Sequence, residues 1–493
     1  MIRRRELLAG TAAFPLLAAR RPIAAKVLSP EPPVTPRIPL RTRQLGRVRI
    51  DDYAWLKPKN WQEVWRDPGR LDPRILAYLD EENRYCDAVL KPTERLQAEL
   101  VRDMKRHVPE ALASPAIPDG PWAYYTRFPA AAQQPRYLRK PRGGGPEQVL
   151  LDAAQRARGK PYLAIRNAIH SPDHRLFAWA EDSGGSEKFT VYVKDLATGT
   201  IHAGPADAFG DFVFSADSRF LFWVWRDPNS RPRRLYRRPV AGGPDTLVYE
   251  EQDAGFLMHV ASSASGDWLL LRSFNDVTSE VRILDAHRPE AEPVLVAPRR
   301  SGVDYAVEHW RDRFVMRTNA NGSDDYMLMW APVRSPTGPW RAWVPHRPGR
   351  TITELHPRAG DFAWLDRVEG NLHVMVCGAD GVPREPVRFS EAAYVLAVQP
   401  SEYRDNALWL TVESPRLPAQ WLRCDLATGK QSVYRNLKTR RFCGRQKRLD
   451  SRLWRRHPQE RRPWPILDPA KQRQHRPNLR PFHVKKIRLG RRR

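Results

Sequence analysis

Residues 51–110 carry apolar side chains at a helical spacing. The first predicted helix gathers four of them on one face: Ile75, Leu76, Tyr78 and Leu79. This helix should end near Pro92, and a second should start at Thr93. The second helix repeats the spacing with Leu96, Leu100, Val101 and Met104. Both helices are amphipathic, so each needs a core that covers its apolar face.

Between Trp122 and Tyr434 the pattern changes to short alternating strands separated by turn residues. Clear examples are 212–214, 221–225, 268–271 and 314–316. The fold class indicated is therefore mainly β, preceded by a helical N-terminal segment.

Two corner sequences recur along this region. Asp-Leu-Ala-Thr-Gly occupies residues 195–199 and again 425–429. Its Asp can cap a tight turn and its Gly can supply a positive φ, so we expect a hairpin corner. A second corner, Ser-x-Asp-x-Arg, occupies 171–175 and 215–219, and 265–267 is a weaker copy.

The strands form seven units of about 45 residues, the period of four-stranded propeller blades. The units start near Trp122, Ile169, Phe212, Met258, Tyr305, Ile352 and Tyr394. An array of β-sandwiches would also fit this spacing. The repeated corners and the absence of linkers between units favour a seven-bladed β-propeller.

The positive charge lies at the two ends of the chain. The formal net charge is +27, of which residues 436–493 carry +18 and residues 1–50 carry +9. Residues 51–435 are therefore neutral. Basic clusters are typical of nucleic-acid binding, but the neutral body argues against a nucleic-acid partner for the folded part.

The first 25 residues resemble an export signal. Arg4-Arg5-Glu6-Leu7-Leu8 opens a short apolar stretch that ends in small residues, as in a twin-arginine signal. The sequence thus predicts export to the periplasm, and an ordinary basic arm on a cytoplasmic protein is the alternative. Residues 26–50, rich in Pro and Arg, are expected to be an extended linker. No apolar run is long enough to predict a membrane-spanning helix.

Specific motifs connect the chain to a known family. Asp52-Tyr53-Ala54-Trp55-Leu56 and the helix around residues 81–85 resemble the N-terminal segment of the prolyl oligopeptidase family of serine peptidases. Residues 185–199 resemble the second blade of oligopeptidase B-like members. Further matches follow in order at 247–251, 278–282, 296–300, 312–314 and 344–347. The resemblance runs from about residue 36 to about residue 435.

This resemblance implies a fold and an activity. In that family a seven-bladed propeller caps an α/β-hydrolase domain with a Ser–Asp–His triad, and the helical segment wraps onto the hydrolase domain. Oligopeptidase B-like members cleave short peptides after Arg or Lys, using acidic residues to hold the basic side chain. Short peptides are the partners implied, and no cofactor is.

The chemistry of the triad is missing from the sequence. No G-x-S-x-G turn occurs, and Gly184-Gly185-Ser186 and Asn321-Gly322-Ser323 are predicted to be hairpin corners. We therefore assign no catalytic residue and expect the chain to be inactive, with the α/β-hydrolase domain absent. Gly143–Gly145 is expected to be a strand connection.

Metal binding is not predicted either, and no cofactor motif occurs. The four cysteines lie far apart and form no CxxC, so neither a disulfide framework nor a zinc site is indicated. We expect the histidines to fall in different blades: His170, His259, His309, His346, His356 and His373. The pairs Glu250-Glu251 and Asp324-Asp325 are expected to be solvated loop charges.

Three explanations remain open for residues 436–493. They could be a tail read in a shifted frame of a GC-rich gene, or a disordered basic tail that binds an anionic partner. They could also belong to a split enzyme whose hydrolase half is a separate chain.

The predicted organisation is a signal (1–25), a linker (26–50), a helical segment (51–117), a propeller (118–435) and a basic tail (436–493). The predicted function is a propeller gating domain of an oligopeptidase B-like protein without its own triad. A non-catalytic propeller that binds peptides or anions is the alternative.

Overall fold

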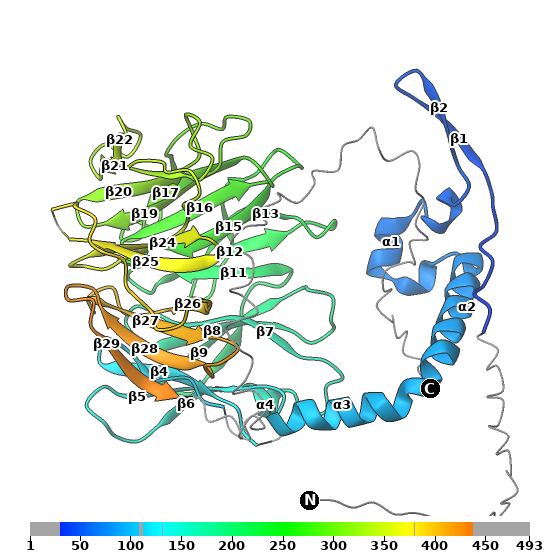
Figure 1. Ribbon diagram of the computed structural model, residues 1–493, viewed down its shortest axis with the longest axis horizontal. Coiled ribbons are helices and arrows are strands. Elements are labelled where there is room, and N and C mark those ends of the chain that lie inside the picture. Colours follow the sequence, from blue (N-terminus) through cyan, green and yellow to red (C-terminus); the bar gives the residue numbers. More distant parts are fainter. Residues whose placement is uncertain (1–29, 108–111, 131, 379, 437–493) are drawn as a thin grey trace, which may run out of the picture. The chain divides into compact units, whose positions relative to one another are not determined.

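The computed structural model describes residues 30–107, 112–130, 132–378 and 380–436 (Figure 1). The chain divides into two compact units, of which the first contains the described residues 30–102 and the second contains 103–436. The export signal predicted over 1–25 and all but the first residue of the predicted basic tail lie outside the described residues.

The first unit begins with a β-hairpin where the sequence predicts an extended linker. Strands β1 (Leu40–Gln44) and β2 (Arg47–Asp51) pair antiparallel. The two residues between them, Leu45 and Gly46, both adopt positive φ, as the tight turn of a two-residue hairpin requires. The second half of the expected linker is therefore paired.

Three α-helices follow: α1 (Trp61–Arg66), α2 (Pro73–Leu90) and α3 (Glu94–His107). Short 3-10 turns separate them: η1 (Ala54–Leu56), η2 (Pro68–Arg70) and η3 (Lys91–Thr93). Asp72 caps α2 by accepting a hydrogen bond of 2.8 Å from the backbone N–H of Arg74. The break between α2 and α3 lies at Pro92, which confirms the two predicted helices. Among the described residues, no helix has the length and apolar character needed to cross a membrane.

Seven antiparallel sheets of consecutive strands follow, which confirms the predicted seven-bladed propeller (Figure 1). Blade 1 contains β3 (Ile117–Asp119), β4 (Trp122–Arg127), β5 (Arg136–Pro141) and β6 (Gln148–Asp152). A short helix, α4 (Ala153–Arg156), leads to blade 2, with β7 (Ala164–His170), β8 (Leu176–Asp182), β9 (Thr190–Asp195) and β10 (Ile201–Ala203). Blade 3 contains β11 (Ala208–Phe214), β12 (Phe220–Arg226), β13 (Pro232–Pro239) and β14 (Thr246–Glu250).

The remaining blades repeat this arrangement. Blade 4 contains β15 (Leu257–Ser262), β16 (Trp268–Phe274), β17 (Ser279–Asp285) and β18 (Val294–Leu295), and blade 5 contains β19 (Tyr305–Trp310), β20 (Arg313–Thr318), β21 (Met327–Pro332) and β22 (Arg341–Val344). Blade 6 has β23 (Thr351–Pro357), β24 (Phe362–Val368) and β25 (Asn371–Cys377), and isolated bridges to Pro383 and Val387 lie beside β25. Blade 7 contains β26 (Val395–Gln399), β27 (Ala407–Glu413), β28 (Gln420–Asp425) and β29 (Gln431–Asn436).

The repeated corners have the predicted role. Asp-Leu-Ala-Thr-Gly joins the third and fourth strands of blades 2 and 7. Asp195 accepts hydrogen bonds of 2.8 Å from the N–H groups of Ala197 and Thr198, and the Gly of each copy has positive φ.

The serine corner joins the first and second strands of blades 2, 3 and 4. The hydroxyl of Ser171 donates to Asp173 at 2.5 Å and accepts from the N–H of Leu176 at 2.9 Å. Ser215 makes the equivalent contacts in blade 3. In blade 4 the equivalent serine is Ser263, which accepts from the N–H of Trp268 at 3.1 Å. The corner of blade 4 therefore starts at Ser263, two residues before the start that the sequence predicts at Ser265.

Candidate functional site

Buried apolar clusters join the successive blades of the propeller. Each of six junctions, from blades 1–2 to blades 6–7, has its own cluster of buried side chains. Trp179, at the junction of blades 1 and 2, and Trp364, at that of blades 5 and 6, are fully buried examples. Among the described residues, no such cluster joins blade 7 to blade 1.

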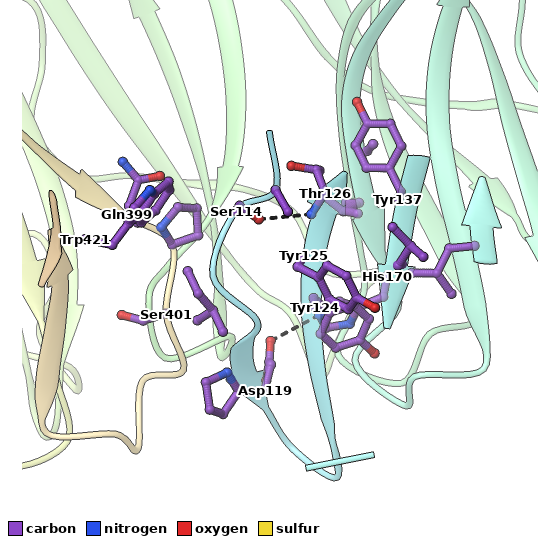
Figure 2. Close-up of a pocket in the computed structure, with 18 of the residues that line it drawn as sticks. Ser114, Asp119, Tyr124, Tyr125, Thr126, Tyr137, His170, Gln399, Ser401 and Trp421 are labelled. Carbon is purple, nitrogen blue, oxygen red and sulfur yellow. Dashed lines mark hydrogen bonds and ion pairs between the residues drawn. The ribbon is translucent and has the colours of Figure 1, made fainter. Parts of the chain in front are cut away.

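A cavity of about 750 Å³ occupies the junction between blades 7 and 1. Figure 2 shows Tyr124, Tyr125 and His170 on one side, and Gln399, Ser401 and Trp421 on the opposite side. We call this space the seam cavity. Its walls combine aromatic rings with polar groups, which is the usual composition of a site for a small organic ligand or a peptide segment.

One wall of the seam cavity carries a stacked group of rings. The Tyr124 ring lies parallel to that of His170, with ring centroids 4.0 Å apart, and the Tyr124 hydroxyl is 2.8 Å from Nδ1 of His174. Nε2 of His170 lies 3.1 Å from a carboxylate oxygen of Asp119, which comes from the end of β3 (Figure 2). This group ties the inner strand of blade 2 to blade 1.

Burial and neighbouring charges shift the pKa of Asp119 in opposite directions. Burial opposes ionisation of Asp119, but the hydrogen bond to His170 and the charges of His170, His174 and Arg142 together lower the pKa of the carboxyl. Burial raises the pKa of Tyr124 to about 12. Burial and the neighbouring His170 lower the pKa of His174. The seam cavity therefore holds an ionised carboxylate, that of Asp119, near the neutral phenol of Tyr124.

Two arginines reach across the seam. Nη1 of Arg142, on the turn after β5, lies 2.9 Å from a carboxylate oxygen of Glu402 in blade 7. Nη1 of Arg435 in β29 donates to the carbonyl of Ala113 at 3.0 Å. The pairs are 260 and 322 residues apart in sequence, so they join the last blade to the first.

The structure places the serine motifs where the sequence predicts them. Gly184-Gly185-Ser186 lies in the hairpin between β8 and β9, and Asn321-Gly322-Ser323 lies between β20 and β21. Gly143–Gly145 connects β5 to β6.

The prediction that six histidines lie in different blades is wrong. His356 and His373 both belong to blade 6, and His346 follows β22 of the same blade as His309. The predicted unit starts at Tyr305, Ile352 and Tyr394 already place each of these two pairs within one unit, because a unit of about 45 residues is long enough to hold two histidines. Across the described ranges, no group of three or more His, Cys, Asp or Glu side chains is arranged to hold a metal ion.

The prediction of solvated carboxylates is wrong for Glu251. Its side chain is 2% exposed and forms an ion pair with Arg299. Glu250, the preceding residue, pairs with Arg234 at 2.8 Å and is partly exposed. Asp325 accepts hydrogen bonds from Thr351 at 2.5 Å and from Gly349 at 2.7 Å.

Sequence reasoning missed the seam residues Asp119, Tyr124 and Glu402. The one available signal is the four-residue spacing of His170 and His174 around the serine corner of blade 2. Nothing in the local sequence connects these residues to Glu402, because only closure of the ring brings them close.

Comparison with known proteins agrees with this architecture. A family model described as "Prolyl oligopeptidase, N-terminal beta-propeller domain" matches residues 33–436. The chain is 31% identical over 408 residues to dipeptidyl aminopeptidase BI of Pseudoxanthomonas mexicana, a match covering 78% of this chain and 55% of that protein. It is 28% identical over 411 residues to Protease 2 of Moraxella lacunata, covering 81% and 57%. The chain thus spans about half the length of the curated relatives it matches.

A solved structure shares the fold. Oligopeptidase B from Leishmania major superposes with a TM-score of 0.74 at 23% identity, covering 83% of this chain and 61% of that one. The family model covers most of the present chain, including every blade of the propeller. This protein therefore belongs to the prolyl oligopeptidase family of peptidases.

Proposed function

We propose that residues 117–436 form the peptide-admitting propeller of a prolyl oligopeptidase-type serine peptidase. We further propose that this chain does not hydrolyse peptides by itself. The observation that carries the proposal is the seam cavity, which lies at the one blade junction where the described residues form no buried apolar cluster.

The cavity suits a short peptide segment. Aromatic rings such as Tyr124, Tyr125 and Trp421 offer apolar surface, and Ser114, Thr126 and Gln399 are available for hydrogen bonds. A ring of blades without an apolar cluster at one junction should also open there more readily than elsewhere, because the apolar burial that resists opening is missing.

The absence of hydrolysis is argued from the sequence. A serine nucleophile of this family requires a sharp G-x-S-x-G turn, and the 493 residues contain none. The serines that come closest to the motif, Ser186 and Ser323, lie in hairpin loops of the propeller. The chain would therefore bind and admit peptides without cleaving them.

The substrate class proposed is short peptides containing Arg or Lys. The resemblance to oligopeptidase B-like members supports this, and so do the carboxylates of Asp119 and Glu402 in the wall of the cavity. We also propose export through the signal predicted over residues 1–25, which fractionation of cells producing the full chain would test.

Peptide binding is tested by titration calorimetry with acetyl-Ala-Ala-Arg-Ala-Ala-amide. We expect saturable binding by the full chain and a clear loss of affinity in Trp421→Ala, which removes one aromatic wall. Trp330→Ala in blade 5 is the matched control and should bind like the unaltered chain. No heat of binding, or equal affinity of the two variants, would contradict a peptide site in the seam cavity.

A further inference from the structure

The closure of the propeller depends on polar contacts that join residues far apart in the chain. The two described contacts across the seam each use one arginine, Arg142 and Arg435. Of these two, only the Arg142 contact is an ion pair, since Arg435 donates to a backbone carbonyl. The partner of Arg142, Glu402, lines the seam cavity.

The Arg142 side chain lies where it can move away from Glu402. It lies on an exposed turn that continues with Gly143, Gly144 and Gly145, and no heavy atom within 4 Å would meet a Cβ added at the first two of these. The turn therefore has room to move, and glycines resist such movement least. The Arg142 side chain is 49% exposed.

Glu402, which accepts the ion pair, is less exposed than Arg142, which donates to it. The Glu402 side chain is only 16% exposed. Nη1 of Arg142 also lies 3.4 Å from the carbonyl oxygen of Gly120, and its charge contributes to the lowered pKa of Asp119. The Arg142 guanidinium thus lies at the edge of the seam cavity, between the carboxylate of Glu402 and the carbonyl of Gly120. The carboxylate of Asp119 is close enough for the Arg142 charge to act on it.

We propose that the Arg142–Glu402 ion pair is a latch that a basic side chain of a bound peptide opens by exchange. The peptide's guanidinium takes the place of Arg142 on Glu402, so the carboxylate keeps a cationic partner while blades 7 and 1 lose their ion pair. No covalent bond is made or broken: one guanidinium replaces another on Glu402, and that of Arg142 moves into solvent. The latch rests on the proposed function, because it makes seam opening selective for basic peptides.

Spin labels on the two sides of the seam test this latch. Exposed positions Pro146 and Arg404 are changed to Cys in the full chain carrying Cys86→Ser and Cys443→Ser. The distance distribution is measured without peptide, with acetyl-Ala-Ala-Arg-Ala-Ala-amide, and with its citrulline counterpart, which has the same shape but no charge. Binding of each peptide is measured separately by calorimetry.

We expect the Arg peptide to shift the distribution to longer distances and the citrulline peptide to leave it unchanged. Glu402→Gln should show the longer distances without peptide, and the combined change Arg142→Glu with Glu402→Arg should restore the shorter ones. Glu250→Gln, which removes an Arg–Glu pair inside blade 3, should behave like the unaltered chain.

Three results would overturn the latch. The first is an unchanged distance distribution in Glu402→Gln, and the second is equal widening by the citrulline peptide. The third is Arg-peptide binding without a change in distance, which would leave the proposed peptide site intact. Rescue by the charge-swapped variant separates loss of the latch from a failure to fold.

Discussion

The carboxylate of Glu308 on β19 accepts a hydrogen bond from the backbone N–H of Ala264, 3.0 Å away in the serine corner of blade 4. The same oxygen accepts from the N–H of His309 at 2.8 Å. Burial raises the pKa of Glu308 to about 7, although these hydrogen bonds and the charge of Arg358 favour the ionised form. A single carboxyl thus joins two blades and changes its charge near neutral pH.

This relationship predicts a pH-dependent stability. The pKa of Glu308 is higher in the folded chain than its usual 4.5, so folding favours the protonated form. Its stabilising contribution is complete below about pH 4.5 and is lost as the pH rises through about 7, a difference of about 1–3 kcal/mol. Glu308→Gln should flatten the stability profile in this range, as measured by urea unfolding. Identical profiles for both proteins would show that Glu308 does not titrate there.

The buried ion pair of Glu251 should be essential to the junction between blades 3 and 4. Arg299 contacts Glu251 and also lies 3.0 Å from a carboxylate oxygen of Glu280, with its guanidinium over the Phe256 ring. Glu251→Ala leaves part of this buried charge uncompensated, so we expect a loss of about 3 kcal/mol in the free energy of unfolding.

The neighbouring carboxylate is the control for this change. Glu250→Ala removes a partly exposed pair with Arg234 and should cost less than about 1 kcal/mol. Equal losses for the two variants in urea unfolding would contradict the distinction between the buried and the exposed pair.

The repeated corner makes a conformational prediction. Gly199 and Gly429 have φ of 77° and 69°, and no atom lies within 4 Å of a Cβ added at either. Changing either one to Ala should cost about 1 kcal/mol through backbone strain alone. Gly143→Ala, which meets no atom and has no positive φ, should be neutral or slightly stabilising. Thermal unfolding of the three variants distinguishes these outcomes, and a neutral Gly199→Ala would exclude the strain.

The apolar face of α3 should bind a hydrophobic dye. Leu96, Leu100, Val101 and Met104 are 54%, 51%, 44% and 62% exposed. Such a row of exposed apolar side chains is typical of an interaction surface. The chain should raise the fluorescence of a hydrophobic dye, and Leu100→Glu with Met104→Glu should reduce the signal. An unaltered signal in the double variant would place the dye elsewhere.

The sequence predicts the blades better than the site, for a physical reason. Blade periodicity is local, since alternation and the Asp195–Gly199 corner act within one hairpin. The seven predicted unit starts therefore fall within five residues of the first strand of each blade.

The seam cavity depends instead on closure of the ring. Arg142 and Glu402 are 260 residues apart, and neither has a distinctive local motif. The buried state of Glu251 was also missed, because its partner Arg299 lies 48 residues further along the chain. Interactions formed between blades leave no periodic trace in the sequence.

The central proposal is that this propeller admits peptides but does not cleave them by itself. The most direct measurement incubates the purified full chain with an Arg-containing chromogenic peptide and records both binding and release of the chromophore. The account predicts saturable binding with no release above the rate without protein. Release of the chromophore that a serine-directed inhibitor abolishes would contradict it.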